Sequence, residues 1–231
     1  MGPLGAEPEA VAEVFGVAVP ATLPKRFNIA PSQPVLAVRT QPGGEQRELV
    51  ALRWGLVPSW ADDPTIGNRL TNARSETVAT KPAFRSSCRS RRCLIVADGF
   101  YEWQQRERGK QPYCIQLKSG KPFGFAGLWD HWDNAGEPID SCTILTCEAN
   151  ALMQPIHHRM PVVIPPERFG LWLDSAVEDV GLLAHLMRPF HPDEMTAFPV
   201  STLVNSVKND SPACRTRAEL VAVEKQTRLF S

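Results

Sequence analysis

A chain of 231 residues is long enough to bury a sizeable core, and its 43% hydrophobic and 22% charged residues are ordinary for a globular protein. Its 25 basic residues equal its 25 acidic ones, so the overall charge indicates no polyanionic partner, and a DNA-binding surface would need uneven placement of the basic residues. No apolar run reaches the roughly 18 residues of a membrane span, and the start lacks the features of a secretory signal. Six cysteines are too few for a disulfide scaffold. We therefore expect a cytoplasmic protein with reduced thiols.

The pattern of the sequence predicts short strands and a few helices. In the clearest helix, 8–16, Val11, Val14 and Phe15 recur at helical spacing before Gly16, which stands where a helix should stop. The other predicted helices are 81–90, 167–173 and 181–187. The predicted strands are 34–39, 49–56, 93–97, 113–117, 123–127 and 143–146. The connections include a turn at 28–31, a hairpin connection at 41–47 and polar turns at 118–121 and 134–137.

These elements indicate one folding unit. The sequence has no visible internal repeat and no linker long enough to divide it. We predict an α+β fold in which residues 1–231 form a single domain around a curved, mostly antiparallel, barrel-like sheet with peripheral helices.

Two pairs of cysteines have the same spacing. Cys88 and Cys93 are five residues apart, as are Cys142 and Cys147, and four thiolates could in principle hold zinc. The spacing is longer than usual for one turn around a metal. In addition, Cys93 and Cys142 each open a predicted strand, whose alternate side chains point to opposite faces. We interpret all four as buried thiols that pack as small hydrophobes, and we expect no metal and no cofactor.

Three segments place polar groups beside aromatic residues and turns, namely 72–76 (NARSE), 98–103 (DGFYEW) and 156–161 (IHHRMP). Each has an ordinary structural explanation. A Glu after a strand is usually a solvated loop end, and paired histidines are more often hydrogen-bonded surface residues than catalytic ones. By composition alone, none of the three segments is specific for a function.

These three segments and four further ones occur in the same order as the sequence motifs of a known family. In chain order the segments are 26–31 (RFNIAP), 53–60 (RWGLVPSW), 72–76, 98–103, 125–129 (FAGLW), 143–146 (TILT) and 156–161. Over about residues 10–210 the chain resembles the SRAP (SOS response-associated peptidase) family.

The resemblance implies a protein that recognises single-stranded or junction DNA carrying an abasic site. In this family the amine of an N-terminal cysteine attacks the ring-opened sugar to give a Schiff base, and the thiol then closes a thiazolidine ring. An α-amine suits this role because its reference pKa is about 7.7–8.0, so a useful fraction is neutral in the cell. The resemblance thus implies a self-crosslinking enzyme of the peptidase or lyase type, monomeric, associated with the nucleoid and without a membrane partner.

By their motif positions, Asn72, Glu102 and His157 correspond to the family's active-site polar residues. The resemblance implies that Asn72 orients the N-terminal residue or the sugar. Glu102 would be the general acid–base in carbinolamine dehydration, and His157 would relay protons or assist ring opening. We choose His157 over His158 because the family's histidine stands two positions before the arginine of its Arg-Met-Pro segment.

The same comparison implies a set of DNA contacts. Arg74 and Arg159 match phosphate-binding arginines, whose planar forks suit phosphate oxygens. Trp54 and Trp60 could stack on bases or cap a duplex end, and core packing is an equally open interpretation of both. Such contacts predict an affinity that depends on salt and not on base sequence.

The sequence departs from the family at its start. The first cysteine is Cys88, and counting back from Phe15, Met1 falls just after the usual Cys-Gly-Arg opening. A truncated or engineered chain, a misassigned start and a natural variant without the nucleophile each fit this departure. We expect this polypeptide to bind abasic DNA without a stable crosslink, or through a reversible Schiff base.

Three other functions are open alternatives. A thiol autopeptidase would use a cysteine that its own cleavage exposes, and a DNA-binding module would bind without chemistry. A zinc hydrolase built on His157, His158 and cysteines ranks last, because it lacks a recognised ligand spacing.

Overall fold

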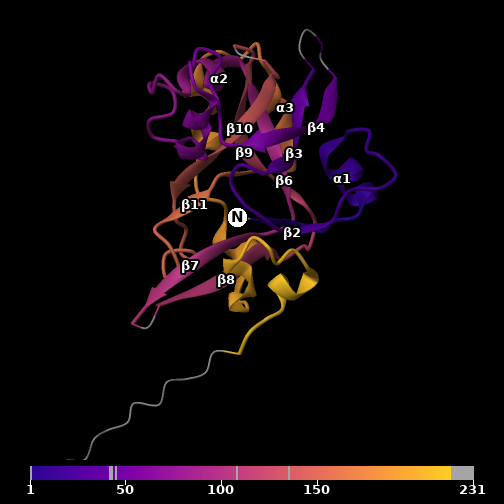
Figure 1. The fold of residues 1–231 in the computed structure, drawn as a ribbon, viewed down its shortest axis with the longest axis vertical. Coiled ribbons are helices and arrows are strands. Elements are labelled where there is room, and N and C mark those ends of the chain that lie inside the picture. Colours follow the sequence, from indigo (N-terminus) through magenta and orange to yellow (C-terminus); the bar gives the residue numbers. More distant parts are fainter. Residues whose placement is uncertain (1, 42–43, 45, 108, 135, 220–231) are drawn as a thin grey trace, which may run out of the picture.

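The computed structural model describes residues 2–41, 44, 46–107, 109–134 and 136–219, and a curved sheet lies at its centre (Figure 1). The strands are β1 (Gly2–Leu4), β2 (Arg26–Ile29), β3 (Pro34–Thr40), β4 (Arg47–Trp54), β5 (Asn72–Arg74), β6 (Arg92–Ala97), β7 (Phe100–Arg106), β8 (Gly109–Leu117), β9 (Phe123–Trp132), β10 (Ile139–Glu148), β11 (Arg159–Pro161), β12 (Val163–Ile164) and β13 (Met195–Pro199). The α-helices are α1 (Pro8–Phe15), α2 (Arg85–Ser90) and α3 (Phe169–Leu173). Shorter 3-10 helices are Pro64–Arg69, Pro166–Arg168, Val180–Leu186, Pro192–Glu194, Thr202–Asn205 and Pro212–Arg215.

The main sheet curves so far that the last strand in its pairing order pairs with the first. Strands β4, β3, β6, β9 and β10 pair in that order, and β10 then pairs with β4. This last pairing is parallel and joins Ser141 to Arg53 and Cys142 to Trp54, whereas the other four are antiparallel. The predicted α+β fold around a curved, mostly antiparallel sheet is confirmed.

Smaller strand groups flank this sheet and complete the frame of the site. β7, β8 and β13 form an antiparallel sheet, and β1 pairs with β2. β5 and β11 both pair with β10, β5 in parallel and β11 in antiparallel orientation. In Figure 1 β7, β11 and the N-terminus therefore lie around one central region.

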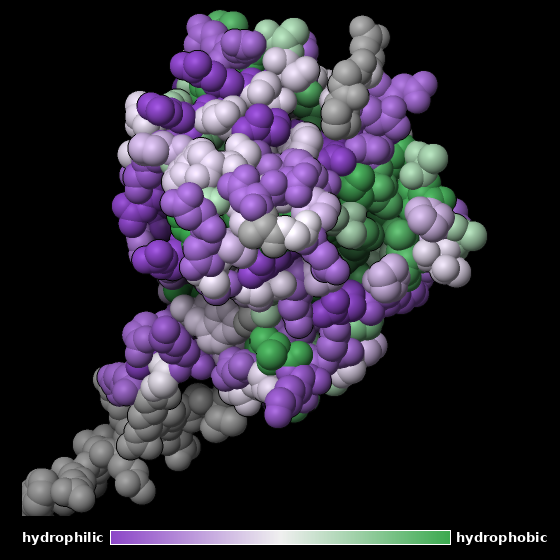
Figure 2. Space-filling model, turned by 45° about the horizontal axis from the view of Figure 1, so that its top comes forward, coloured by the Kyte–Doolittle hydropathy of each residue, from purple (hydrophilic) through white to green (hydrophobic). Residues whose placement is uncertain are grey.

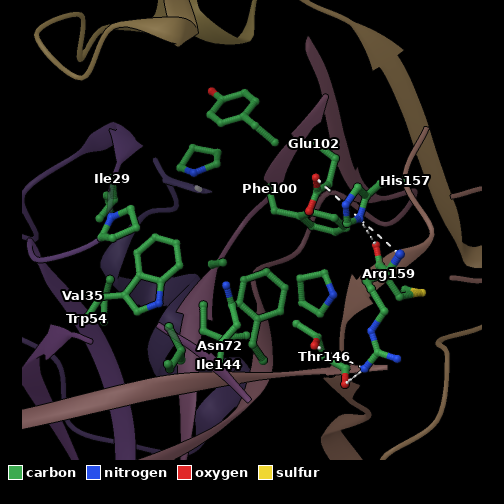
Figure 3. Close-up of a pocket in the computed structure, with 18 of the residues that line it drawn as sticks. Ile29, Val35, Trp54, Asn72, Phe100, Glu102, Ile144, Thr146, His157 and Arg159 are labelled. Carbon is green, nitrogen blue, oxygen red and sulfur yellow. Dashed lines mark hydrogen bonds and ion pairs between the residues drawn. The ribbon is translucent and has the colours of Figure 1, made fainter. Parts of the chain in front are cut away.

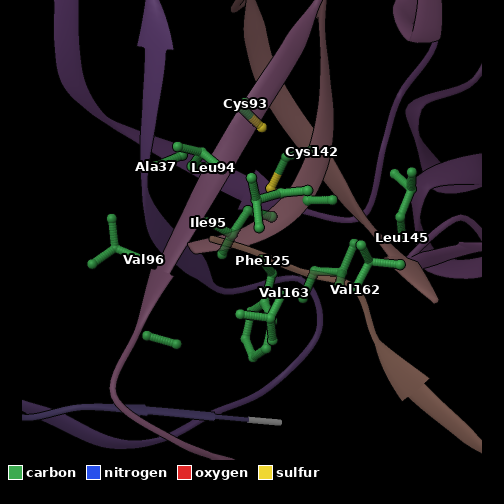
Figure 4. Packing of buried hydrophobic residues seen from close by; sticks show 14 of the residues in the cluster. Ala37, Cys93, Leu94, Ile95, Val96, Phe125, Cys142, Leu145, Val162 and Val163 are labelled. Carbon is green, nitrogen blue, oxygen red and sulfur yellow. The ribbon is translucent and has the colours of Figure 1, made fainter. Parts of the chain in front are cut away.

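The core fills the inside of the curved sheet. All six residues of β6 are buried, as a continuous apolar run in a central strand predicts (Figure 4). α1 covers one side through Val11 and Phe15, and the Phe15 ring stacks on that of Phe169 with centroids 5.2 Å apart. Gly16 ends this helix in the left-handed conformation at φ 63°, as the sequence predicts.

The six cysteines are free thiols, and every one is buried. Burial raises the pKa of Cys88 and of Cys114 to about 11, and that of Cys147 to about 12. A thiol held protonated in this way is a poor nucleophile.

Two groups of sequence predictions need correction. The turn expected at 28–31 is wrong at its start, because Asn28 belongs to β2 and its buried amide donates to backbone carbonyls of Val204, Ser206 and Asn209. Residues 26–29 form a strand because they pair with β1, more than twenty residues away, so no local pattern reveals it. The helix predicted at 81–90 shortens to α2, and that at 181–187 is the 3-10 helix Val180–Leu186. The hairpin connection at 41–47 lies partly outside the described residues.

The face shown in Figure 2 is mostly hydrophilic, with apolar side chains gathered on its right side. The large exposed apolar residues of the described chain are Trp60, Leu182, Leu203 and Val207. None of the described helices combines the length and the apolar character that a membrane crossing needs.

Candidate active site

A cavity of about 400 Å³ opens where β5, β7 and the segment before β11 meet (Figure 3). Its polar lining residues are Asn72, Arg74, Glu102, Thr146, His157, His158 and Arg159. The remaining wall is mostly apolar and includes Val35, Trp54, Phe100, Phe125 and Ile144. A few polar groups that converge in a largely apolar pocket are typical of a ligand site.

Asn72 and Arg74 reach the cavity because of the pleat of β5. This strand lies parallel to β10, with Asn72 opposite Ile144 and Arg74 opposite Thr146. Between them, Ala73 is 1% exposed and points into the core, so its two neighbours must point the other way. The short strand therefore places an amide and a guanidinium side by side at the pocket.

Glu102 reaches the cavity from β7. Glu102 and Phe100 alternate with Tyr101 along the strand, and the Phe100 ring packs edge-on against Phe125 with centroids 5.8 Å apart. The Glu102 side chain is 26% exposed, so it is half-buried in the pocket wall and not the solvated loop end that composition favours. Burial raises its pKa, while the positive charge of His157 and a hydrogen bond from the Trp103 backbone oppose that shift.

His157 lies at the end of the turns that follow β10. Its backbone N–H donates to the carbonyl of Met153, whose own N–H donates to the Asn150 side chain. Nδ1 of His157 accepts the backbone N–H of Arg159 at 3.1 Å and lies 3.0 Å from the Arg159 carbonyl oxygen. The first contact suits an unprotonated Nδ1 and the second a protonated one, so either state of the ring finds a backbone partner.

Glu102 and His157 form the ionisable centre of the cavity. Oε2 of Glu102 lies 4.0 Å from Nδ1 of His157, and the His158 ring lies 4.5 Å from the His157 ring between centroids (Figure 3). A carboxyl whose pKa is raised by burial, beside an imidazole, is a pair of groups suited to proton transfer.

Arg159 is paired within the protein. Its guanidinium donates to both carboxylate oxygens of Glu76, at 2.6 and 2.9 Å, and to the Thr146 carbonyl. The hydrogen bonds from Arg159 hold the pKa of Glu76 below its usual range. By contrast, Arg74 is exposed and makes no ion pair with the described residues, so Arg74 presents the more available fork.

The two tryptophans differ in exposure. Trp54 is 5% exposed, lines the pocket wall and donates its indole N–H to the Thr71 carbonyl, so it is part of the core. Trp60 is 55% exposed and lies outside the residues that line the cavity.

Some lining residues were not singled out from the sequence. Pro3 comes from β1, where a short proline-containing start gives no strand signal, and Thr146 comes from β10, where it appears as an ordinary strand residue. The motif position favours His157 over His158, yet both line the cavity. None of the six cysteines does, and the described residues contain no group of three or more His, Cys, Asp or Glu side chains placed to hold a metal.

The sequence of this chain matches one known protein family over most of its length. Residues 3–207 match the model of the SOS response associated peptidase (SRAP) family. The chain belongs to the SRAP family. It is 45% identical over 188 residues to the "Abasic site processing protein YoqW" of Bacillus subtilis (strain 168), a match that covers 80% of this chain and 83% of the relative.

A further SRAP relative and two solved structures are also similar to this chain. The chain is 37% identical over 208 residues to the "Abasic site processing protein HMCES" of Gallus gallus, covering 79% of this chain and 61% of the relative. Its fold matches a crystal structure of a protein from Bacteroides thetaiotaomicron with a TM-score of 0.83 and 25% identity, over 94% of this chain and 99% of the other. A protein from Bordetella bronchiseptica matches with a TM-score of 0.74 and 29% identity, over 87% and 98% of the two chains. This SRAP protein thus has relatives that process abasic sites, which supports a function in DNA processing.

Proposed function

We propose that this SRAP protein recognises single-stranded or junction DNA at an abasic site and reacts reversibly with the sugar aldehyde. The observation that supports this proposal is that Asn72, Glu102 and His157 line one cavity, into whose wall the start of the described chain also contributes Pro3. Three polar groups in one pocket, beside a strand from the first residues of the sequence, fit amine chemistry on a small carbonyl.

The reaction starts at the N-terminal amine. The amine nitrogen attacks the aldehyde carbon, a C–N bond forms, and a proton passes from nitrogen to the former carbonyl oxygen to give a carbinolamine. Glu102, whose pKa burial raises, is the acid that gives a proton to the hydroxyl group, which leaves as water. The nitrogen loses a proton as the C=N bond forms, and His157 or the Glu102 carboxylate accepts it. Asn72 orients the sugar by hydrogen bonding.

The DNA backbone is held at the mouth of the pocket. The exposed Arg74 binds a phosphate next to the lesion, and Arg159 joins it by exchanging part of its pairing with Glu76. The exposed Trp60 stacks on a neighbouring base, while the buried Trp54 shapes the pocket wall. These contacts are independent of base sequence, and such a protein would work at the nucleoid as a monomer.

The cysteines of this sequence supply no thiol to the pocket. None of the six lines the cavity, and Cys88, the first of them, is buried in α2, where burial raises its pKa to about 11, so none of these thiols can close a thiazolidine ring there. The imine is therefore open to hydrolysis.

The test is to incubate the protein with abasic single-stranded DNA, with and without borohydride, and to run a denaturing gel. We expect a shifted band only with borohydride, which reduces the imine to a stable amine. A heat-stable band without borohydride would contradict the reversible step. Addition of Met-Cys-Gly-Arg ahead of the helix α1 should then produce the stable band.

The same assay separates the alternative functions. A binding module without chemistry would shift native gels but give no trapped band, and Glu102→Gln would change nothing. A thiol autopeptidase would show loss of N-terminal residues beyond methionine in an intact-mass measurement.

A further inference from the structure

The strand β1, at the beginning of the described chain, is held by few sheet contacts. Its Pro3 lines the cavity and its Leu4 is 3% exposed in the core. β1 pairs with β2 at Gly2 opposite Ile29 and at Leu4 opposite Arg26, and the register shifts between these pairs. A three-residue strand at a chain end tends to fray unless other contacts tie it down.

Asp98 supplies such a contact. Its Oδ2 accepts the backbone N–H of Gly5 at 2.9 Å, and its own N–H donates to the Pro3 carbonyl at 3.4 Å. The Asp98 side chain is 8% exposed, and hydrogen bonds to a charged acceptor shielded from water are among the strong ones. The next residue, Gly99, lies against Pro3, because a Cβ built on Gly99 would be 3.3 Å from the proline ring. Residues 98 and 99 thus hold β1 in addition to its pairing with β2.

Arg215 fixes the Asp98 carboxylate in turn. Its Nη1 lies 2.9 Å from Oδ2 of Asp98, and its Nη2 donates to the Gln116 side chain on β8 at 3.2 Å. Arg215 ends the 3-10 helix Pro212–Arg215 and lies beyond the residues 3–207 that match the family model. This segment is itself anchored, since Cys214 is buried and Val200 bridges Arg217.

We propose that Asp98 and Arg215 are positioning residues that set where the start of the chain meets the pocket. Neither side chain lines the cavity, so both act through β1. This inference rests on the proposed function, in which the N-terminal amine attacks the sugar aldehyde beside Glu102. It adds that a segment far along the chain, outside the family match, controls the rate of that attack.

The experiment compares Asp98→Ala and Arg215→Gln with the conservative variants Asp98→Asn and Arg215→Lys in the full chain. Three quantities are measured: the rate of borohydride trapping on abasic single-stranded DNA, the Kd for DNA with a tetrahydrofuran abasic analogue that has no aldehyde, and amide hydrogen exchange of residues 2–5. A matched control is Glu48→Gln, which breaks the ion pair that Glu48 makes with Arg39 at 2.7 Å, outside the pocket lining.

We expect Asp98→Ala to lower the trapping rate about tenfold or more and to speed exchange of residues 2–5 about tenfold, with the analogue Kd within about twofold of wild type. Asp98→Asn keeps an acceptor for Gly5 and should recover most of the rate, as should Arg215→Lys. A trapping rate that Asp98→Ala leaves unchanged, unchanged exchange of residues 2–5, or an equal loss of rate and analogue binding would each overturn the inference. Failure of the wild-type protein to trap any adduct would instead overturn the proposed function.

Discussion

Nδ1 of His157 faces three groups at once, namely the Glu102 carboxylate at 4.0 Å and the backbone N–H and carbonyl of Arg159 at 3.1 and 3.0 Å. The Arg159 backbone offers a hydrogen-bond partner to either protonation state of the ring, because its N–H can donate to Nδ1 and its carbonyl can accept from a protonated Nδ1. A proton can therefore move between Glu102 and His157 without leaving an unpaired ring nitrogen. This relationship makes the pair the centre of the predicted chemistry.

Glu102→Gln should abolish most trapping and also stabilise the fold. Because burial raises the pKa of Glu102 in the native state, ionised Glu102 weakens the fold above that pKa, and the penalty disappears as the pH falls through it. The neutral Gln avoids this penalty, so we expect a gain of about 1 kcal/mol near pH 8, or about 2–4 °C in Tm, that shrinks toward pH 4. Thermal unfolding at several pH values measures the gain. A lower Tm than wild type at pH 8 would show that the carboxylate is not penalised.

His157→Asn separates proton transfer from loop structure. The Asn Oδ1 can take the place of Nδ1 and still accept the Arg159 N–H, but an amide cannot take up and release a proton as an imidazole does. We expect the trapping rate to fall about a hundredfold, typical of a lost general acid or base, with Tm within about 2 °C of wild type. His158→Asn is the matched control and should lower the rate less than about threefold. Equal losses in the two variants would argue against the choice of His157.

Arg74→Ala should reduce the salt dependence of DNA binding. If Arg74 contacts one phosphate of single-stranded DNA, its loss lowers the slope of log K against log salt by about 0.7. The affinity should fall equally for all base sequences, since a phosphate contact carries no sequence information. Fluorescence anisotropy at several salt concentrations measures both. Lys121→Ala is the control, because Lys121 is paired with Glu13 and lies outside the pocket lining, and it should keep the wild-type slope.

Glu76→Gln should strengthen DNA binding. The Glu76 carboxylate accepts two hydrogen bonds from the Arg159 guanidinium. Replacing Glu76 with neutral Gln weakens this pairing, makes the guanidinium available to DNA and removes a negative charge near the DNA. We expect the affinity for unmodified single-stranded DNA to rise about threefold at low salt and the gain to disappear at high salt. Weaker binding by this variant would mean that Glu76 holds Arg159 in its DNA-binding orientation. Stability should change by less than about 1 kcal/mol, because the Glu76 side chain is 47% exposed.

Gly55→Ala should destabilise the fold near the pocket. Gly55 has φ 133°, and an added Cβ would lie 2.6 Å from the Gly67 carbonyl oxygen, which is backbone and cannot move aside easily. We expect a loss of about 2 kcal/mol or more in the free energy of unfolding, measured by denaturant titration. Gly109→Ala is the control, since Gly109 also has a positive φ, 88°, but open space around it, and it should cost about 1 kcal/mol. Equal losses would show that the contact with Gly67 is unimportant.

The parts of the fold that the sequence predicts are those with a local signal. The apolar run 93–97 predicts β6, and the helical spacing of Val11 and Phe15 with a following glycine predicts α1. Neither strand β5 nor strand β7 has such a signal. β5 exists because residues 72–74 pair in parallel with β10, about seventy residues away, and β7 exists because β8 pairs with it.

The candidate site was found by motif order and not by the chemistry of any one segment. By composition, Glu102 fits a solvated loop end, and only the order of the motifs sets it beside Asn72 and His157. The pairing of Arg159 with Glu76 and the burial of Trp54 could not be predicted, because each depends on how segments far apart in the sequence pack together. Asp98 was part of a recognised motif, yet its contact with Gly5 depends on where the chain start docks.

The parallel pairing of β10 with β4 has a consequence for biosynthesis. Residue 53 is synthesised long before residue 141, so the strands that carry Asn72 and Glu102 emerge from the ribosome before the sheet can close. His157 emerges later still, and Arg215, the partner of Asp98, emerges after His157. A nascent polypeptide therefore lacks the assembled pocket until the segment that carries His157 has emerged.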